Sequence, residues 1–128
     1  MTLAFVVLTV AVLALDLITK FTIPGILNPG VAWGVGANVS WLWVVIVVFS
    51  FALVAMAVWW FFHTKRRTWL LTIGLALFIG GVLGNAIDRL VTGGAVHDFI
   101  NFVIFQNNLA DMAIIVGATL VGVQVALR

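Results

Sequence analysis

Long runs of hydrophobic residues, separated by shorter polar segments, divide the chain into four apolar stretches. They cover residues 2–19, 41–62, 69–87 and 109–127. An α-helix needs about 20 apolar residues to cross the hydrocarbon core of a bilayer, and each stretch is close to that length. The pattern therefore predicts an all-α integral membrane protein with four transmembrane helices. We expect residues 1–128 to form a single transmembrane domain.

The composition agrees with the membrane prediction. Hydrophobic residues make up 65% of the chain and charged residues 8%, and the mean hydropathy is +1.31. A soluble domain is about one half apolar and about one quarter charged. A water-soluble fold of 128 residues has too little interior to bury this much apolar surface. The composition thus excludes a large soluble domain, a nucleic-acid-binding surface and a disordered chain.

The distribution of basic residues predicts the orientation in the membrane. Residues 65–67, between the second and third stretches, are three consecutive basic residues. The positive-inside rule places such a loop in the cytoplasm. With four spans, both termini are then cytoplasmic, and segments 20–40 and 88–108 lie on the outer side.

The first apolar stretch is expected to be a spanning helix and not a cleaved signal peptide. No basic residue precedes it, and Asp16 and Lys20 stand where a cleavable signal peptide has small residues. These two residues are four apart with the acid first, which is the favourable order for a helical ion pair. We interpret them as an ion pair at the membrane edge. The alternative is that Lys20 helps to orient the first outer loop.

All acidic residues gather at one predicted membrane face. Asp16 and Asp88 stand at the outer ends of the first and third stretches, Asp98 lies in the second outer loop, and Asp111 lies in the first turn of the fourth stretch. Carboxylates at membrane depth are costly, so their clustering indicates a functional site. Asp88 is followed by Arg89, a cation that would keep the carboxylate ionised, which favours a structural or positioning role for Asp88.

The first outer loop contains a turn with groups able to bind a ligand. Pro29 and Gly30 mark the turn, and glycine lets a backbone approach a ligand closely. The amide of Asn28 offers both a donor and an acceptor. The alternative interpretation is a turn without a ligand.

Two further asparagines accompany the aspartates at helical spacing. Asn85 precedes Asp88 by three residues and Arg89 by four, so all three can share a helix face. Asn108 precedes Asp111 by three residues in the same way. Without a ligand, the first group would be a polar clamp at a helix end. Asp111 would then serve as a helix cap, favoured by the helix dipole.

Asp98 and Asp111 form the candidate catalytic pair. Two close carboxylates cannot both ionise easily, so they share one proton. The ionised member can take a proton from water while the protonated member hydrogen-bonds the carbonyl under attack. This would hydrolyse a peptide without metal, thiol or serine. The chain has no Cys, and His63 and His97 fall on opposite sides of the membrane, so no metal or other cofactor is expected.

Five short motifs, in order along the chain, resemble those of the lipoprotein signal peptidases, also called signal peptidase II. They are Asp-x-x-x-Lys at 16–20, Asn-x-Gly-x-Ala-aromatic within 28–34, Gly-Asn-x-x-Asp-Arg at 84–89, Val-x-Asp-Phe at 96–99 and Asn-x-Ala-Asp at 108–111. Each is weak alone, but their order at the ends of four spans makes the resemblance specific. It also implies a small extracytoplasmic β/loop element, a cradle and a loop over the catalytic pair.

The resemblance implies an aspartic endopeptidase of the bacterial inner membrane, with several spans and its active site toward the periplasmic or outer side. Such enzymes remove signal peptides from prolipoproteins by cutting just before a diacylglyceryl-modified cysteine. The implied partners are the lipidated prolipoprotein and membrane lipids, with no nucleic acid and no obligate protein partner.

The family's functional positions can be carried over motif by motif. The catalytic residues would be Asp98 and Asp111. The implied substrate-binding or supporting residues are Asn28, Asn85, Asp88, Arg89 and Asn108, to which we add Gly30, Asp16 and Lys20 because they lie in the matching motifs.

Two other function classes remain open. Intramembrane carboxylates also mark ion paths in channels and transporters. Such a path needs polar residues through the whole membrane, whereas the middle and inner parts of the spans are almost purely apolar. A membrane scaffold without enzymatic activity would tolerate Asn at each outer aspartate.

Overall fold

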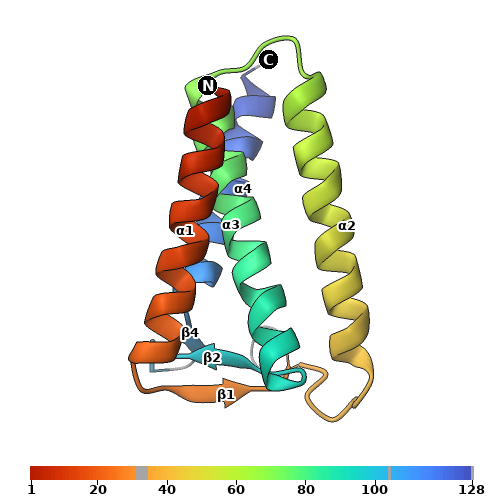
Figure 1. Cartoon of the computed structure of the whole chain (residues 1–128), viewed down its shortest axis with the longest axis vertical. Helices are drawn as coiled ribbons and strands as arrows, with labels where there is room; N and C mark the ends of the chain where they lie inside the picture. Colours follow the sequence, from red (N-terminus) through yellow and green to blue (C-terminus); the bar gives the residue numbers. More distant parts are fainter. Residues whose placement is uncertain (31–34, 104, 128) are drawn as a thin grey trace.

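The described part of the chain forms four helices, which run side by side in the computed structural model (Figure 1). The structure describes residues 1–30, 35–103 and 105–127, so residues 31–34 of the motif within 28–34 lie outside the described part. The helices are α1 (Thr2–Thr22), α2 (Leu42–His63), α3 (Trp69–Thr92) and α4 (Leu109–Ala126). All four are long and apolar enough to cross a membrane. The predicted fold class is confirmed.

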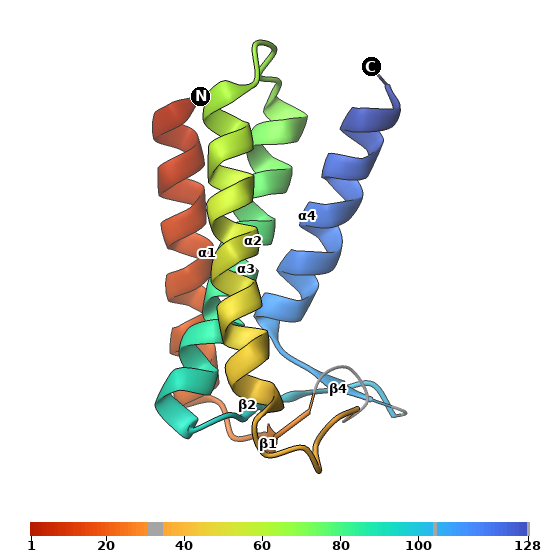
Figure 2. The ribbon, with the colours of Figure 1, turned by 90° about the vertical axis from the view of Figure 1, so that its right-hand side faces the viewer.

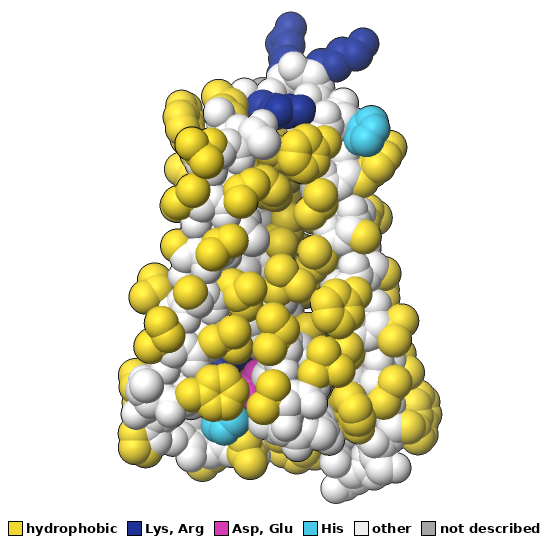
Figure 3. Space-filling view, in the orientation of Figure 1, with side chains coloured by type: hydrophobic (Ala, Val, Ile, Leu, Met, Phe, Trp, Pro, Cys, Tyr) yellow, Lys and Arg dark blue, Asp and Glu magenta, His cyan; other side chains and the backbone are white. Residues whose placement is uncertain are grey.

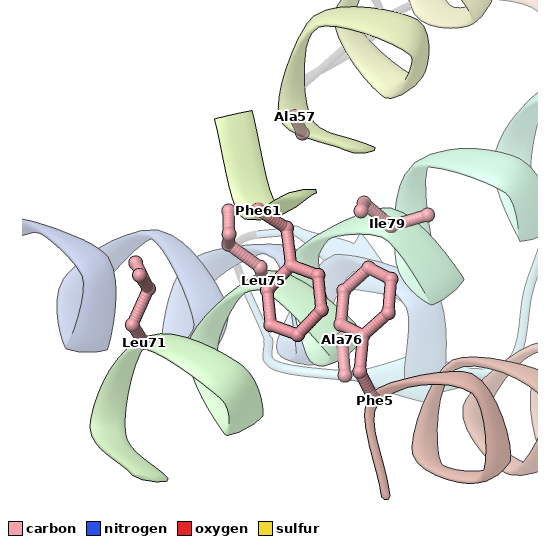
Figure 4. Packing of buried hydrophobic residues seen from close by; sticks show 7 residues of the cluster. All are labelled: Phe5, Ala57, Phe61, Leu71, Leu75, Ala76 and Ile79. Atoms are coloured by element: carbon pink, nitrogen blue, oxygen red, sulfur yellow. The ribbon is translucent and has the colours of Figure 1, made fainter. Parts of the chain in front are cut away.

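Helix α3 is the centre of the bundle, with α1, α2 and α4 packed against it (Figures 1 and 2). A hydrophobic cluster joins three of these helices. In it the rings of Phe5 from α1 and Phe61 from α2 stack with centroids 3.9 Å apart beside α3 (Figure 4). On the other side of α3, a Cβ added at Gly117 would lie 2.6 Å from the backbone oxygen of Gly74. The α3–α4 contact therefore depends on the absence of side chains there.

Among the described residues, four short strands form two small antiparallel sheets, which lie at the end of the bundle opposite the termini (Figure 1). Strand β1 (Ile26–Asn28) pairs with β2 (Val96–Asp98), and β3 (Ile100–Asn101) pairs with β4 (Gln106–Asn107). The first pairing places the segment after α1 next to the segment after α3. It therefore joins two of the motifs found in the sequence. The predicted small β element is present.

Most of the bundle's visible surface is hydrophobic, as expected for helices that face lipid (Figure 3). Lys and Arg side chains gather at the end that carries the termini, and an acidic group is visible toward the opposite end (Figure 3). The α2–α3 loop lies at the end with the termini (Figure 1). The two ends of the molecule thus differ in charge.

Candidate active site

The lower end of α1 contributes a buried ion pair. The Lys20 Nζ lies 2.7 Å from Asp16 Oδ2, and both side chains are fully buried, as the spacing of four predicted. The other oxygen of Asp16 accepts the backbone N–H of Ala110 at 2.7 Å, in the first turn of α4. A Cβ at Gly84 of α3 would collide with the Asp16 carboxylate, so glycine is required where these helices meet.

Asp88, in the last turns of α3, is held by groups from other elements. Its Oδ1 lies 2.7 Å from Nδ1 of His97, and its Oδ2 accepts the His97 backbone N–H at 2.7 Å. The Nζ of Lys20 lies 3.8 Å from the same Oδ2. The Asp88 side chain is fully buried. It therefore joins α3 to both α1 and strand β2.

Asp88 makes its contacts with His97 and Lys20 and not with Arg89, the partner suggested by the sequence. Adjacent residues on a helix do not face each other. Arg89 points the other way, and its Nη2 donates to the backbone oxygen of Gly30 at 3.1 Å. The Nε of Arg89 is buried and has no hydrogen-bond partner among the described residues. Arg89 thus supports the loop that follows β1, and it retains an unused donor.

Asn85 connects the ion pair to α4. The Nζ of Lys20 donates to Asn85 Oδ1 at 2.8 Å, and Asn85 Nδ2 donates to Asp111 Oδ1 at 2.8 Å. An ammonium group can only donate, so Lys20 fixes which end of the amide faces Asp111. The sequence predicted that Asn85 would accompany Asp88 and Arg89, but its link to Asp111 comes from the packing of α3 on α4.

Asn108 and Asp111 form a reciprocal cap at the start of α4. The Asn108 side-chain oxygen accepts the Asp111 backbone N–H at 3.0 Å, and Asp111 Oδ2 accepts the Asn108 backbone N–H at 3.3 Å. Because its oxygen is occupied, the fully buried Asn108 amide presents its N–H₂ group to Asp98. Nδ2 donates to Asp98 Oδ1 at 2.7 Å. Asn108 therefore contacts both predicted catalytic carboxylates.

Asn28 holds the second oxygen of Asp98. Its own side-chain oxygen accepts the Gly30 backbone N–H at 3.0 Å, which leaves Nδ2 to donate to Asp98 Oδ2 at 3.1 Å. The turn at Pro29 and Gly30 thus fixes the orientation of the Asn28 amide. Each oxygen of Asp98 faces an amide donor whose orientation is set by a backbone N–H group.

Opposing effects act on the protonation of Asp98, which lies in β2 and is only 3% exposed. Burial raises the pKa of Asp98, and the nearby charge of Asp111 adds to the rise. The donors on Asn28 and Asn108 and the charge of Lys20 act to lower the pKa, but burial is the largest effect, so the pKa is above its ordinary value. Asp98 is thus easier to protonate than a solvated aspartate.

A cavity of about 450 Å³ opens onto both carboxylates. Most of its polar lining comes from residues that the sequence identified, namely Asn28, Gly30, Asn85, Arg89, Asp98 and Asp111. Ser50, Gln106 and Asn107 add polar groups that the sequence did not identify. Asp16, Lys20, Asp88 and Asn108 are not part of the lining and support it from behind. The predicted site residues therefore form one connected arrangement in two layers.

The cavity also has walls that the sequence did not identify. On one side α2 contributes Ile46, Ser50 and Leu53, and on the other α4 contributes Ile114 and Ile115. These helices flank α3 (Figure 2). Their apolar residues look like any lipid-facing residues in the sequence, so only the fold distinguishes them. The result is a space with mostly apolar walls on α2 and α4 and with most of its polar groups at the end with the strands.

Among residues 1–30, 35–103 and 105–127, no group of three or more His, Cys, Asp or Glu side chains is arranged to hold a metal ion. His97 lies on Asp88 at the strand end, whereas His63 ends α2 at the other end of the bundle. The donors directed at the two cavity carboxylates are amides and backbone N–H groups. This arrangement suits acid–base chemistry by carboxyl groups.

Comparisons with known proteins agree with the arrangement. The family model described as Signal peptidase (SPase) II matches residues 5–127. The chain is 41% identical over 109 residues to a lipoprotein signal peptidase of Lactobacillus gasseri, a match covering 77% of this chain and 68% of that protein. It is 39% identical over 112 residues to one of Lactobacillus johnsonii, covering 80% of this chain and 70% of that protein.

Solved structures share the fold. A bacterial membrane enzyme determined by the in meso method at 2.3 Å superposes with a TM-score of 0.81 and 23% identity, covering 95% of this chain and 87% of that chain. A second, at 1.9 Å, gives a TM-score of 0.77 and 23% identity, covering 94% and 91% of the two chains. The helix and strand arrangement described above is therefore also found in experimental structures.

Proposed function

The chain belongs to the signal peptidase II family of proteases, and from this premise we propose that it removes signal peptides from prolipoproteins through an aspartic mechanism centred on Asp98 and Asp111. The observation that carries the proposal is the double role of Asn108. Its side chain donates to Asp98, and its backbone N–H donates to Asp111, at the edge of one cavity. If Asn108 served only to cap α4, its side-chain N–H₂ group would not need to contact Asp98.

The proposed mechanism assigns different protonation states to the two aspartates. Asp98, whose pKa is raised by burial, carries the shared proton. Asp111, which accepts hydrogen bonds from Asn85 and Asn108, is the ionised base. Asp111 takes a proton from a water molecule, whose oxygen attacks the scissile carbonyl carbon. Asp98 donates its proton to the carbonyl oxygen as the tetrahedral intermediate forms.

Collapse of the intermediate completes the reaction. The carbon–nitrogen bond breaks, and the leaving amine receives the proton that Asp111 took from water. Asp98 recovers its proton as the carbonyl reforms, so both carboxyl groups return to their starting states. The surrounding amides stay in place because Lys20, Gly30 and Asp111 each fix one of them. A preorganised site of this kind needs little rearrangement during reaction.

The polar groups and the apolar wall of the cavity favour a peptide substrate that carries a lipid group at one end. We propose that the peptide runs past Asn28 and Arg89, with the unused Nε of Arg89 donating to a substrate carbonyl. The apolar wall formed by α2 and α4 would face the diacylglyceryl-modified cysteine, whose acyl chains extend along the helices into the bilayer. Cleavage would fall just before this cysteine.

The proposed site faces the outer side of the bacterial cytoplasmic membrane. The basic residues at 65–67 lie in the loop at the end of the bundle with the termini, and the aspartates lie toward the other end (Figure 1). The positive-inside rule assigns the basic end to the cytoplasm. Water then reaches the aspartates from the outer surface.

Cleavage of a matched peptide pair tests the proposed function. The purified full chain would be incubated in detergent micelles with a prolipoprotein peptide that carries a diacylglyceryl cysteine and with the same peptide lacking the lipid. Mass spectrometry would locate the cut. We expect cleavage immediately before the modified cysteine and little cleavage of the lipid-free peptide. No cleavage of either peptide by folded protein, or a cut elsewhere, would contradict the proposal.

A further inference from the structure

Resting on the function proposed for Asp98, we infer that His97 is a positioning residue, which fixes strand β2 to the end of α3 and thereby aims the Asp98 carboxyl group into the cavity. His97 does not line the cavity in the described part of the chain. Its role would therefore be exerted through Asp88.

The contact between His97 and Asp88 uses both oxygens of one carboxylate. Nδ1 of the ring lies 2.7 Å from Oδ1, and the backbone N–H donates to Oδ2 at 2.7 Å. Because a carboxylate accepts hydrogen bonds, Nδ1 is the ring nitrogen that carries the proton in this contact. The Asp88 side chain is fully buried. Hydrogen bonds to a carboxylate are among the strongest in proteins. The two contacts therefore hold strand β2 firmly against the end of α3.

The alternation of side chains along β2 connects this attachment to Asp98. Successive residues of a strand point to opposite faces. Val96 and Asp98 line the cavity, and His97 between them faces α1 and α3, where its ring meets the Phe21 ring edge-on at 5.4 Å. Holding His97 on one face of the strand therefore determines where Asp98 points on the other face.

Strand β2 needs such an attachment because its sheet is very small. It has three residues and pairs only with the three residues of β1 in the described part of the chain. A two-stranded sheet is marginally stable on its own in water. The pairing brings Asp98 opposite Ile26, but it does not tie the sheet to the helices. The His97–Asp88 contact ties β2 to α3, and Asn108 ties Asp98 to α4.

The His97–Asp88 contact also lies close to Lys20 and Asn85, the residues that hold Asp111 in place. Asp88 Oδ2 is 3.8 Å from Lys20, which orients the Asn85 amide that donates to Asp111. Loss of the His97 ring would leave Asp88 free to move toward Lys20. Both carboxyl groups of the proposed catalytic pair would then lose part of their support.

Four single substitutions test this role on the lipidated peptide. His97→Ala removes the ring donor, and His97→Leu removes it while keeping an apolar group against Phe21. His97→Asn places an amide N–H close to the position of Nδ1. His63→Ala is the matched control, because His63 lies at the opposite end of the bundle on Trp59. The readouts are kcat, KM and thermal unfolding for each purified variant.

We expect His97→Ala and His97→Leu to lower kcat about 10-fold, the equivalent of one hydrogen bond to a charged group, with little change in KM. His97→Asn should recover most of the lost kcat, which a general loss of packing would not allow. His63→Ala should leave kcat unchanged. Either donor-free variant suffices, so failure of one to fold does not prevent the test.

A double-mutant cycle tests the route through Asp88. Asp88→Asn, His97→Ala and the double variant would be compared in the same assay. If His97 acts through Asp88, the double variant should be no slower than the slower single variant, because interacting residues are not additive. Losses that multiply would overturn the inference. So would wild-type kcat in both donor-free variants, or failure of His97→Asn to recover activity.

Asp98→Asn in the same preparations separates this inference from the proposed function. Suppose that the wild-type chain cleaves the peptide and that Asp98→Asn is inactive. If both donor-free His97 variants are then as fast as wild type, the inference about His97 fails while the proposed function stands. If Asp98→Asn remains active, the proposed catalytic function fails.

Discussion

The Asn108 amide donates to Asp98 over 2.7 Å, and this orientation is imposed by the helix that Asn108 caps. Its oxygen is bound to the backbone N–H of Asp111, so only the N–H₂ group is left for Asp98. The residue that caps the start of α4 thus also connects strand β2 to that helix. The start of the helix and the geometry of the proposed catalytic pair depend on one side chain.

Substitution of this cap should separate stability from activity. Asn108→Ser keeps a residue that caps helices well but removes the donor to Asp98. We expect kcat to fall about 10-fold, with only a small change in the thermal unfolding temperature. Thr68→Ser is the matched control, because Thr68 caps α3 at the other end of the bundle. Equal kcat values for the two variants would show that the Asn108 donor has no catalytic part.

The pH dependence of cleavage should respond to Asn28. In the proposed mechanism Asp98 must be protonated, so kcat/KM falls as pH rises through the pKa of Asp98. The Asn28 donor lowers that pKa, so Asn28→Ala should raise it. The falling limb of the kcat/KM profile should therefore move to higher pH in Asn28→Ala. A shift to lower pH, or an unmoved limb, would show that Asp98 is not the group that carries the proton.

The contact at Gly84 should control stability. A side chain there would meet the Asp16 carboxylate, whereas a Cβ at Gly122 of α4 has no atom within 4 Å. We expect Gly84→Ala to lower the free energy of unfolding by about 1–3 kcal/mol, the usual cost of overpacking. Gly122→Ala should be neutral or stabilising by about 0.4–1 kcal/mol. Thermal or denaturant unfolding in detergent measures both, and equal stabilities would contradict the helix packing described here.

Single cysteines can establish the orientation, because the chain has no Cys of its own. Val103, 97% exposed near the strands, and Lys65, in the basic loop, mark the two ends of the bundle. In intact spheroplasts, a membrane-impermeant maleimide should label Val103→Cys and label Lys65→Cys only after lysis. The reverse pattern would place the aspartates on the cytoplasmic side.

The helices were predictable because their length and apolar character follow directly from the bilayer. Helix α3 departs most from the predicted bounds, since it continues to Thr92 and does not end near residue 87. Asp88 and Arg89 are charged but buried, and they contact partners from α1, β2 and the loop that follows β1. Hydropathy along one segment does not reveal partners supplied by other segments.

The candidate site was predictable as a set of residues but not as a network. The spacing of four predicted the Asp16–Lys20 ion pair, which depends on one helix only. The link from Asn85 to Asp111 and that from Asn28 to Asp98 cross between elements, and spacing along the chain does not define them. The contact of His97 with Asp88 was not predicted, although the place of His97 next to Asp98 in a strand would have put it on the opposite face.

Turnover of the lipidated peptide by Asp98→Asn, Asp111→Asn and the double variant is the most direct test of the shared-proton pair. We expect each single variant to lose about 100-fold or more of kcat, the usual contribution of acid–base catalysis. The double variant should be no slower than the slower single one, because the two carboxyl groups work as a unit. Wild-type kcat in either folded single variant, or losses that multiply in the double variant, would contradict the pair.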